Sequence, residues 1–194
     1  MQIVARLFES KIAEKIEKYR NRDENVIWVS ELVQCKQKAE LSKQFYILDI
    51  IEPRFVLGDL VHVGMQEFLG IYYNAETEVE FEKDLENYTI SGRVDAIIGD
   101  TVIEIKYCSD LYENQPYEHH VQQLKLYLWL TEKEKGKLIY ISPKRIVEFD
   151  VEGKPSDDEV LMLIDTWKSP RYEWECSYCP FAKICSKAIV KEKR

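Results

Sequence analysis

A predicted β-hairpin near the middle of the chain brings two acidic side chains and a lysine together. Gly99-Asp100 is a two-residue turn signal between two runs of strand-forming residues. A turn of this length pairs residues whose numbers sum to 199, which sets Asp95 directly opposite Glu104. Because like charges in that position destabilise a sheet, we expect a divalent cation such as Mg²⁺ between the carboxylates. Lys106 lies on the same face, where it could neutralise developing charge or orient an attacking water.

The two faces of this hairpin differ in character. The face opposite the acidic pair is wholly apolar and is expected to be core, with Val94, Ala96, Ile98, Ile103 and Ile105. The residues alone leave a second interpretation open, in which the acids are surface groups bridged by Lys106.

Polar residues at helical spacing form a second group of candidates. His62 follows Gly58 by one turn and could give a metal site a nitrogen ligand, which would favour Mn²⁺ over Mg²⁺. On another predicted helix His120, Gln123 and Tyr127 share one face. Both interpretations have a simpler alternative. His62 could be a structural histidine, and the face with His120, Gln123 and Tyr127 could be a solvated helix surface.

Cysteine spacing indicates a second site. Cys176, Cys179 and Cys185 crowd into one short segment, and Cys35 stands far upstream. Four thiolates can complete one tetrahedral site, for which Zn²⁺ and an iron–sulfur cluster are both suitable. Such a site would join the N-terminal part of the chain to its C-terminal tail, whereas the alternative is four unrelated buried thiols. Cys108 is expected to be a free thiol.

Hydrophobic periodicity predicts the elements that position these residues. Predicted helices are an amphipathic one that opens the chain, a short one capped by Ser30 and extended over 38–46, and longer ones over 53–72, 116–135 and 156–167. Predicted strands cover residues 76–82, 88–98, 101–107, 137–142 and 145–151.

Composition and charge narrow the classes of protein that fit. The chain has 194 residues, 45% of them hydrophobic, which indicates a folded domain of ordinary size. Its 27 basic and 35 acidic residues give a net charge of −8, which excludes a uniformly basic nucleic-acid binder. No apolar run is long enough for a signal peptide or a membrane span, so we expect a soluble, cytoplasmic protein.

Taken in order, the motifs resemble those of the RecB-like nucleases in the PD-(D/E)xK superfamily. The matching pieces are Gly58-x-x-x-His62, Gly92-Arg93-Val94-Asp95, Glu104-Ile105-Lys106 and Gln123-x-x-x-Tyr127. Val94 stands where the name of the superfamily has proline. With the cysteine layout added, roughly residues 30–186 resemble the small CRISPR-associated RecB-like exonucleases of the Cas-four family.

The resemblance implies an α/β fold in three parts. A mixed central sheet flanked by helices (51–170) would be the nuclease core, and a helical N-terminal part (1–50) with Cys35 would be joined to a C-terminal cysteine module (171–194) by an iron–sulfur site. The implied ligands of Mn²⁺ or Mg²⁺ are His62, Asp95, Glu104 and the Ile105 carbonyl. Lys106 would be the catalytic lysine, with Gln123 and Tyr127 positioning DNA or that lysine. Cys35, Cys176, Cys179 and Cys185 would hold the cluster, with [4Fe–4S] favoured over [2Fe–2S].

The implied activity is that of a metal-dependent DNA exonuclease. It would trim single-stranded ends and overhangs and prepare spacer fragments for the Cas-one and Cas-two integrase proteins. Two alternatives stay open: a RecB-like nuclease of DNA repair or viral origin that works with a separate helicase, and a non-catalytic iron–sulfur module that binds DNA ends. Aromatic residues expected on the surface would serve DNA stacking or a homo-oligomer: Tyr72, Tyr73, Tyr112 and Tyr117.

Overall fold

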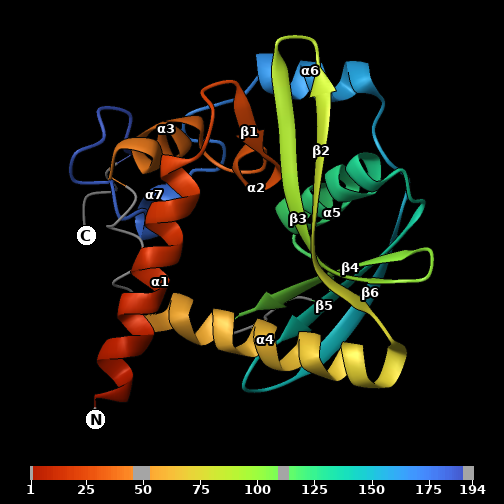
Figure 1. Cartoon of the computed structure of the whole chain (residues 1–194). Helices are drawn as coiled ribbons and strands as arrows, with labels where there is room; N and C mark the ends of the chain where they lie inside the picture. Colours follow the sequence, from red (N-terminus) through yellow and green to blue (C-terminus); the bar gives the residue numbers. More distant parts are fainter. Residues whose placement is uncertain (1, 46–52, 109–113, 190–194) are drawn as a thin grey trace.

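The computed structural model describes residues 2–45, 53–108 and 114–189 (Figure 1). Two sequence expectations lie outside these ranges, namely the surface aromatic Tyr112 and the end of the predicted helix 38–46. Within the described residues, no helix combines the length and the apolar character that crossing a membrane requires.

A six-stranded mixed sheet is the centre of the fold. Its strands are β1 (Val26–Trp28), β2 (Glu76–Leu85), β3 (Tyr88–Ile98), β4 (Thr101–Tyr107), β5 (Lys135–Ile141) and β6 (Ile146–Glu152). The order is β1-β3-β4-β5-β6, with β2 paired to β3 as well. The β1–β3 and β4–β5 pairs are parallel and the others are antiparallel. The expected mixed central sheet is therefore confirmed.

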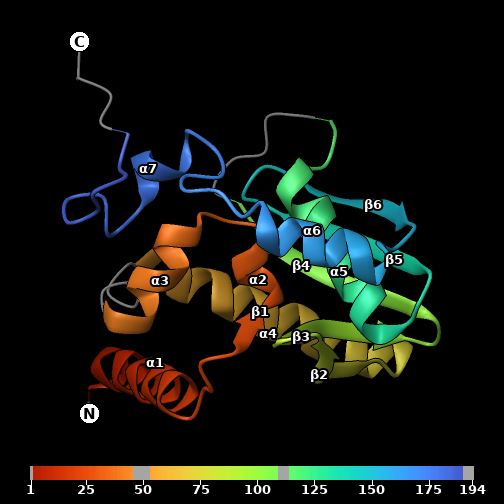
Figure 2. The same cartoon turned by 90° about the horizontal axis from the view of Figure 1, so that it is seen from above.

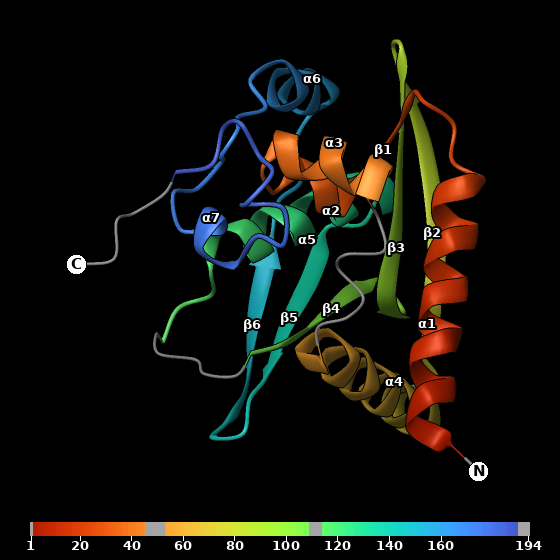
Figure 3. The same cartoon turned by 90° about the vertical axis from the view of Figure 1, so that its left-hand side faces the viewer.

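Seven helices in the described part of the chain surround the sheet. They are α1 (Ile3–Arg20), α2 (Val29–Leu32), α3 (Lys36–Phe45), α4 (Pro53–Tyr73), α5 (Glu118–Thr131), α6 (Asp157–Asp165) and α7 (Glu175–Tyr178). Figure 3 shows α4 and α5 on opposite sides of β4. Seen from above in Figure 2, α1, α3 and α7 lie to one side of the sheet.

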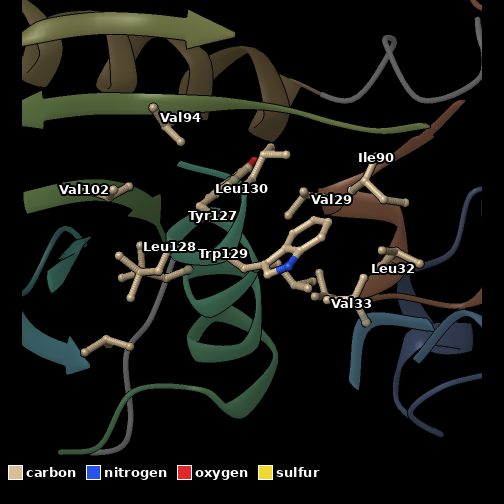
Figure 4. Packing of buried hydrophobic residues seen from close by; sticks show 14 of the residues in the cluster. Val29, Leu32, Val33, Ile90, Val94, Val102, Tyr127, Leu128, Trp129 and Leu130 are labelled. Atoms are coloured by element: carbon tan, nitrogen blue, oxygen red, sulfur yellow. The ribbon is translucent and has the colours of Figure 1, made fainter. Parts of the chain in front are cut away.

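Two hydrophobic clusters anchor α2, α4, α5 and α6 to the sheet. The larger one joins α2 and α5 to the sheet through residues such as Val29, Leu32, Ile90 and Trp129 (Figure 4). The smaller one packs Leu69 of α4 against four sheet residues, Ala96, Ile103, Ile105 and Ile139. Because α4 and α5 are fixed from opposite faces, the polar side chains that they direct at the sheet are also held in place.

The predicted hairpin register is confirmed at the turn and ends before the acidic pair. Ile98 pairs with Thr101, Ile97 with Val102 and Ala96 with Ile103, all of which sum to 199. The ladder then stops, so Asp95 and Glu104 are not a directly paired couple. On the other edge of β3, the ladder with β2 skips the Glu78–Asp95 pair as well.

Local changes in both β2 and β3 accompany this interruption. Glu78 has a positive φ of 54°, which no regular strand residue adopts. Val94 packs in the larger cluster, beside α5. Ala96, two residues further on, packs in the smaller cluster, beside α4. Our expectation that Val94 shares the face of Ala96 is therefore wrong, because β3 turns its side chains over at Asp95.

Several predicted boundaries also need correction. Ser30 does not cap α2, because Trp28 occupies the N-cap position and its N–H donates to Glu31 at 3.2 Å. The predicted helix 116–135 runs only over Glu118–Thr131, since Glu132 adopts a left-handed conformation that ends it. The Ser156 capping box is present, although α6 ends at Asp165.

Candidate active site

Asp95 is held from two sides at the point where β3 leaves its ladders. Its Oδ2 accepts a hydrogen bond of 2.7 Å from the backbone N–H of Ile105. Its Oδ1 lies 3.3 Å from Nδ1 of His62, which α4 directs toward the sheet. Burial lowers the pKa of His62, but the hydrogen bond and charge of Asp95 outweigh burial, so the net pKa is raised. The contact with Asp95 therefore stabilises the protonated imidazole relative to an isolated histidine.

Glu104 and Lys106 form a second pair on β4. Nζ of Lys106 lies 2.6 Å from Oε1 of Glu104 and donates to Oε1 of Gln123 at 2.9 Å. Nε2 of Gln123 donates in turn to the hydroxyl of Tyr127 at 3.2 Å. The predicted polar face of α5 is therefore not solvated here, because Gln123 and Tyr127 are buried and their hydrogen bonds lead to Lys106.

Glu104 is buried with one oxygen unsatisfied. Its side chain and backbone together are 2% exposed, and desolvation raises its pKa to about 7 although Lys106 opposes the shift. Its Oε2 has no hydrogen-bond partner among the described residues. A buried oxygen without a donor carries a desolvation cost that a bound cation would remove.

The donor types in this site suit a divalent cation. Carboxylates suit Mg²⁺, and the imidazole of His62 extends the choice to Mn²⁺. Over the described ranges, however, no three His, Cys, Asp or Glu side chains converge as metal ligands do, since His62 turns to Asp95 and Glu104 to Lys106. The unsatisfied Glu104 oxygen is the observation that fits a cation. The role of the Ile105 carbonyl stays a prediction.

Gln66 is a site residue that the sequence analysis missed. It is buried on α4, one turn after His62, and Nε2 donates to the carbonyl oxygen of Asp95 at 3.3 Å. The same amide donates to Glu78, whose carboxylate is 2.7 Å from Nε of Arg93. Gln66 thus binds both strands where their ladder is interrupted. Its i,i+4 spacing from His62 was the only signal in the sequence.

Gly92 lets α5 approach β3 closely. A Cβ atom at this position would lie 2.7 Å from Cε1 of Tyr127 and 3.1 Å from Cγ2 of Val29. Any larger residue would therefore push Tyr127 away from the site. A groove of about 580 Å³ reaches this point and includes Asp95 and Tyr127 among its lining residues. Its lining carries both signs of charge, namely Lys18, Arg22 and Arg93 together with Glu80, Glu82 and Asp84.

The four cysteines expected to form a second site line one small pocket. Cys35 comes from the segment before α3, and Cys176, Cys179 and Cys185 come from α7 and the residues after it. All four are free thiols, and burial raises the pKa of Cys35 and of Cys179. Cys108 is also a free thiol, and it packs against the larger hydrophobic cluster rather than in this pocket. The four thiols line the same pocket, but within the described ranges no three of them converge as metal ligands do, and the cluster they would hold stays a prediction.

Glu175 links Cys35 to the C-terminal module by hydrogen bonds. Its Oε1 accepts a 2.7 Å hydrogen bond from the N–H of Cys35, and its Oε2 accepts from the N–H groups of Arg171 and Tyr172 at 2.9 and 2.8 Å. Arg171 also donates to the carbonyl of Leu32 at 3.0 Å. These bonds join segments about 140 residues apart in the chain.

We expect Glu175→Ala to lower the free energy of unfolding by about 3–5 kcal/mol, because three backbone N–H groups lose a charged acceptor. That corresponds to a fall in Tm of roughly 10 °C for a chain of this size. Thermal unfolding followed by circular dichroism measures it. The exposed Glu173→Ala is the matched control, and an equal fall in both variants would contradict the role of Glu175.

Aromatic side chains surround the start of α5. The hydroxyl of Tyr140 accepts from the N–H of Tyr117 at 3.0 Å and lies 2.9 Å from Nδ1 of His120. The hydroxyl can donate its proton to Nδ1 when the imidazole is neutral. Burial, the charge of Lys106 and His119 lower the pKa of His120 to about 2.

This lowered pKa predicts a loss of stability in acid. The unfolded state binds a proton on histidine below pH of about 6.5, while folded His120 does not, so stability is complete above that pH and falls as pH decreases. We expect the parent protein to lose about 1 kcal/mol per pH unit more than His120→Gln between pH of about 6.5 and about 4.5. Urea unfolding at a series of pH values measures the difference, and parallel curves would contradict the assignment.

This chain is similar in sequence to known nucleases. Residues 72–186 match the profile of the PD-(D/E)XK nuclease superfamily. The CRISPR-associated exonuclease Cas4 of Saccharolobus solfataricus is 38% identical over 196 residues, which covers 91% of this chain and 96% of the relative. The chain belongs to the Cas4 family of PD-(D/E)XK nucleases. The expectation drawn from the four motifs and the cysteine layout is thus confirmed.

Solved structures agree with this membership. The crystal structure of SSO0001 superposes with a TM-score of 0.90 at 35% identity and covers 98% of this chain and 99% of its own. An alkaline exonuclease from Laribacter hongkongensis has a TM-score of 0.50 at 14% identity, covering 81% and 87% of the two chains. This second likeness shows the fold alone. Within the Cas4 fold, the motif residues His62, Asp95, Glu104, Lys106, Gln123 and Tyr127 all lie in the one site described above.

Proposed function

We propose that this Cas4-family nuclease is a metal-dependent exonuclease that acts on single-stranded DNA ends and overhangs. The observation that carries the proposal is the buried Glu104 with an unsatisfied oxygen, flanked by Lys106 and by the His62–Asp95 pair. His62, Asp95 and Glu104 would hold Mn²⁺ or Mg²⁺. Bound there, the ion would supply a polarised phosphate and an activated water.

The protein side chains have separate tasks in this proposal. Lys106 places a positive charge beside the phosphate, where negative charge develops as the phosphodiester bond is cleaved. Gln123 orients the ammonium group of Lys106 by a direct hydrogen bond, and Tyr127 orients Gln123. Gln66 holds the backbone of Asp95, so that its carboxylate stays on Ile105 and His62.

The iron–sulfur cluster and the wider role are part of the same proposal. The shared pocket of Cys35, Cys176, Cys179 and Cys185 supports a cluster, with [4Fe–4S] favoured and a structural task. The name of the Saccharolobus relative supports a CRISPR-associated role. Within that role we propose that the protein prepares spacer fragments, with the integrase proteins Cas-one and Cas-two as partners. Protein purified without oxygen should be brown, and a colourless protein with stoichiometric zinc would contradict the cluster.

The test of the activity compares the parent with Asp95→Ala on end-labelled DNA. Single strands, duplexes with 5′ or 3′ tails and blunt duplexes are incubated with Mn²⁺, with Mg²⁺ or with EDTA. We expect stepwise shortening of single strands and tails, only with metal, and a loss of at least about 10²-fold in Asp95→Ala. Binding of tailed DNA without cleavage in either metal would instead identify a non-catalytic DNA-end-binding module.

A further inference from the structure

Three aromatic rings meet between α5 and the segment that enters α7. The rings of Tyr172 and Trp174 stack with their centroids 5.6 Å apart and an angle of 14° between their planes. The ring of His119, on the first turn of α5, lies 5.1 Å from Trp174 and 5.8 Å from Tyr172. We name His119, Tyr172 and Trp174 the aromatic platform. Figure 3 shows α7 beside the start of α5, where this platform lies.

The platform is open to solvent and has an uncharged histidine. Trp174 is 48% exposed, which is unusual for the largest apolar side chain. Burial and the charge of Lys106 lower the pKa of His119 to about 4, so its ring is a neutral aromatic surface near pH 7. The guanidinium of Arg171 lies 5.9 Å from the ring of Tyr172 and adds positive charge at the edge.

The platform lies one helical turn from Gln123, which binds the proposed catalytic lysine. His119, Gln123 and Tyr127 follow one another at i,i+4 spacing along one side of α5, and each turn advances about 5.4 Å. Gln123 bonds directly to Lys106, and the charge of Lys106 acts on both His119 and His120. A strand with its phosphate at Lys106 would therefore place a neighbouring base at the platform.

We propose that the aromatic platform is a stacking subsite for a nucleobase adjacent to the scissile phosphate. The inference rests on the proposed function, because it takes single-stranded DNA as the ligand. Bases stack on aromatic faces irrespective of sequence, since every base has a π-face. The subsite thus binds unpaired nucleotides of any sequence and excludes paired ones, whose faces are already covered by their neighbours.

The test measures DNA binding without cleavage, in protein that carries Asp95→Ala so that the strand stays intact. The probe is a short fluorescein-labelled oligothymidylate, titrated by fluorescence anisotropy. Adding Trp174→Ala should weaken binding about tenfold, which equals about 1.4 kcal/mol, while Trp174→Phe should retain most of the affinity. The matched control is Tyr178→Ala, which removes another exposed aromatic residue of the same module and should leave the affinity unchanged.

A substrate series keeps the inference falsifiable if Trp174→Ala disturbs the cysteine module. One abasic position is moved along the oligonucleotide, and binding to protein with an intact Trp174 is measured for each. We expect one position at which the missing base costs about as much as Trp174→Ala and at which the two losses do not add. Equal affinity at every position, or unchanged binding in Trp174→Ala, would overturn the subsite.

The two proposals fail in different ways. If the parent protein cleaves single strands and Trp174→Ala keeps the same Kd and KM, the exonuclease stands and the platform is wrong. If binding depends on Trp174 and on one base but no metal supports cleavage, the platform stands and the proposed activity is wrong.

Discussion

Lys106→Ala should lower the rate of single-strand cleavage by about 10²–10³-fold or more while the protein remains folded. The ammonium group of Lys106 lies 2.6 Å from Oε1 of Glu104, and Gln123 fixes its direction by a hydrogen bond. Without it, the negative charge that develops on the phosphate has no lysine to neutralise it. Single-turnover cleavage with saturating protein and Mn²⁺ measures the chemical step directly.

The control for this prediction is Lys137→Ala. Lys137 is also a strand lysine in an ion pair, but its two partners, Glu148 and Asp150, are exposed carboxylates of β6. We expect cleavage by this variant to stay within about twofold of the parent. A Lys106→Ala protein that cleaves at the parent rate, with the same Tm, would remove Lys106 from the mechanism.

Cys35→Ser should have the largest effect on stability. If Cys35 is one of four cluster ligands, its substitution removes the link that the cluster makes between the N-terminal part and the module that contains α7. Structural metal sites contribute many kcal/mol to folding, so we expect a fall of at least about 4 kcal/mol in the free energy of unfolding, or roughly 10 °C in Tm. Visible absorbance of the protein should fall with it.

Cys108→Ser is the matched control for this variant. Cys108 is a free thiol outside the four-cysteine pocket, and burial raises its pKa. Its substitution should leave iron content and visible absorbance unchanged. Full retention of iron in Cys35→Ser would show that the three remaining cysteines suffice, and the predicted ligand set would then be wrong.

Short-range signals in the sequence predicted much of this fold. Gly99-Asp100 fixed the hairpin register, and alternating apolar residues located its strands, because both depend on neighbours in the chain. The motif residues could be assigned to one site because their order matches a family. Periodicity alone could not say that Gln123 and Tyr127 are buried, since that depends on how α5 packs on β3 beside Gly92.

Contacts between distant segments were beyond the sequence. No sequence pattern indicates that Glu175 accepts a hydrogen bond from the N–H of Cys35. None indicates that Trp174 contacts His119 on α5. The departure of Asp95 from both ladders depends on Glu78, a residue on a neighbouring strand with a positive φ. Such features arise from tertiary packing and have no local pattern.

The conformation of Glu78 has a consequence for engineering this protein. A non-glycine residue at positive φ costs on the order of 1 kcal/mol, and Glu78 lies where the ladder between β2 and β3 skips Asp95. Glycine at that position would relax the backbone but would release Gln66 and Arg93, which both bind the Glu78 carboxylate. Relief of the backbone strain and loss of these two contacts act in opposite directions on the free energy of unfolding. The same substitution would also loosen Gln66, which binds the backbone of Asp95, so Glu78 links the stability of the strand pair to the position of a predicted metal ligand.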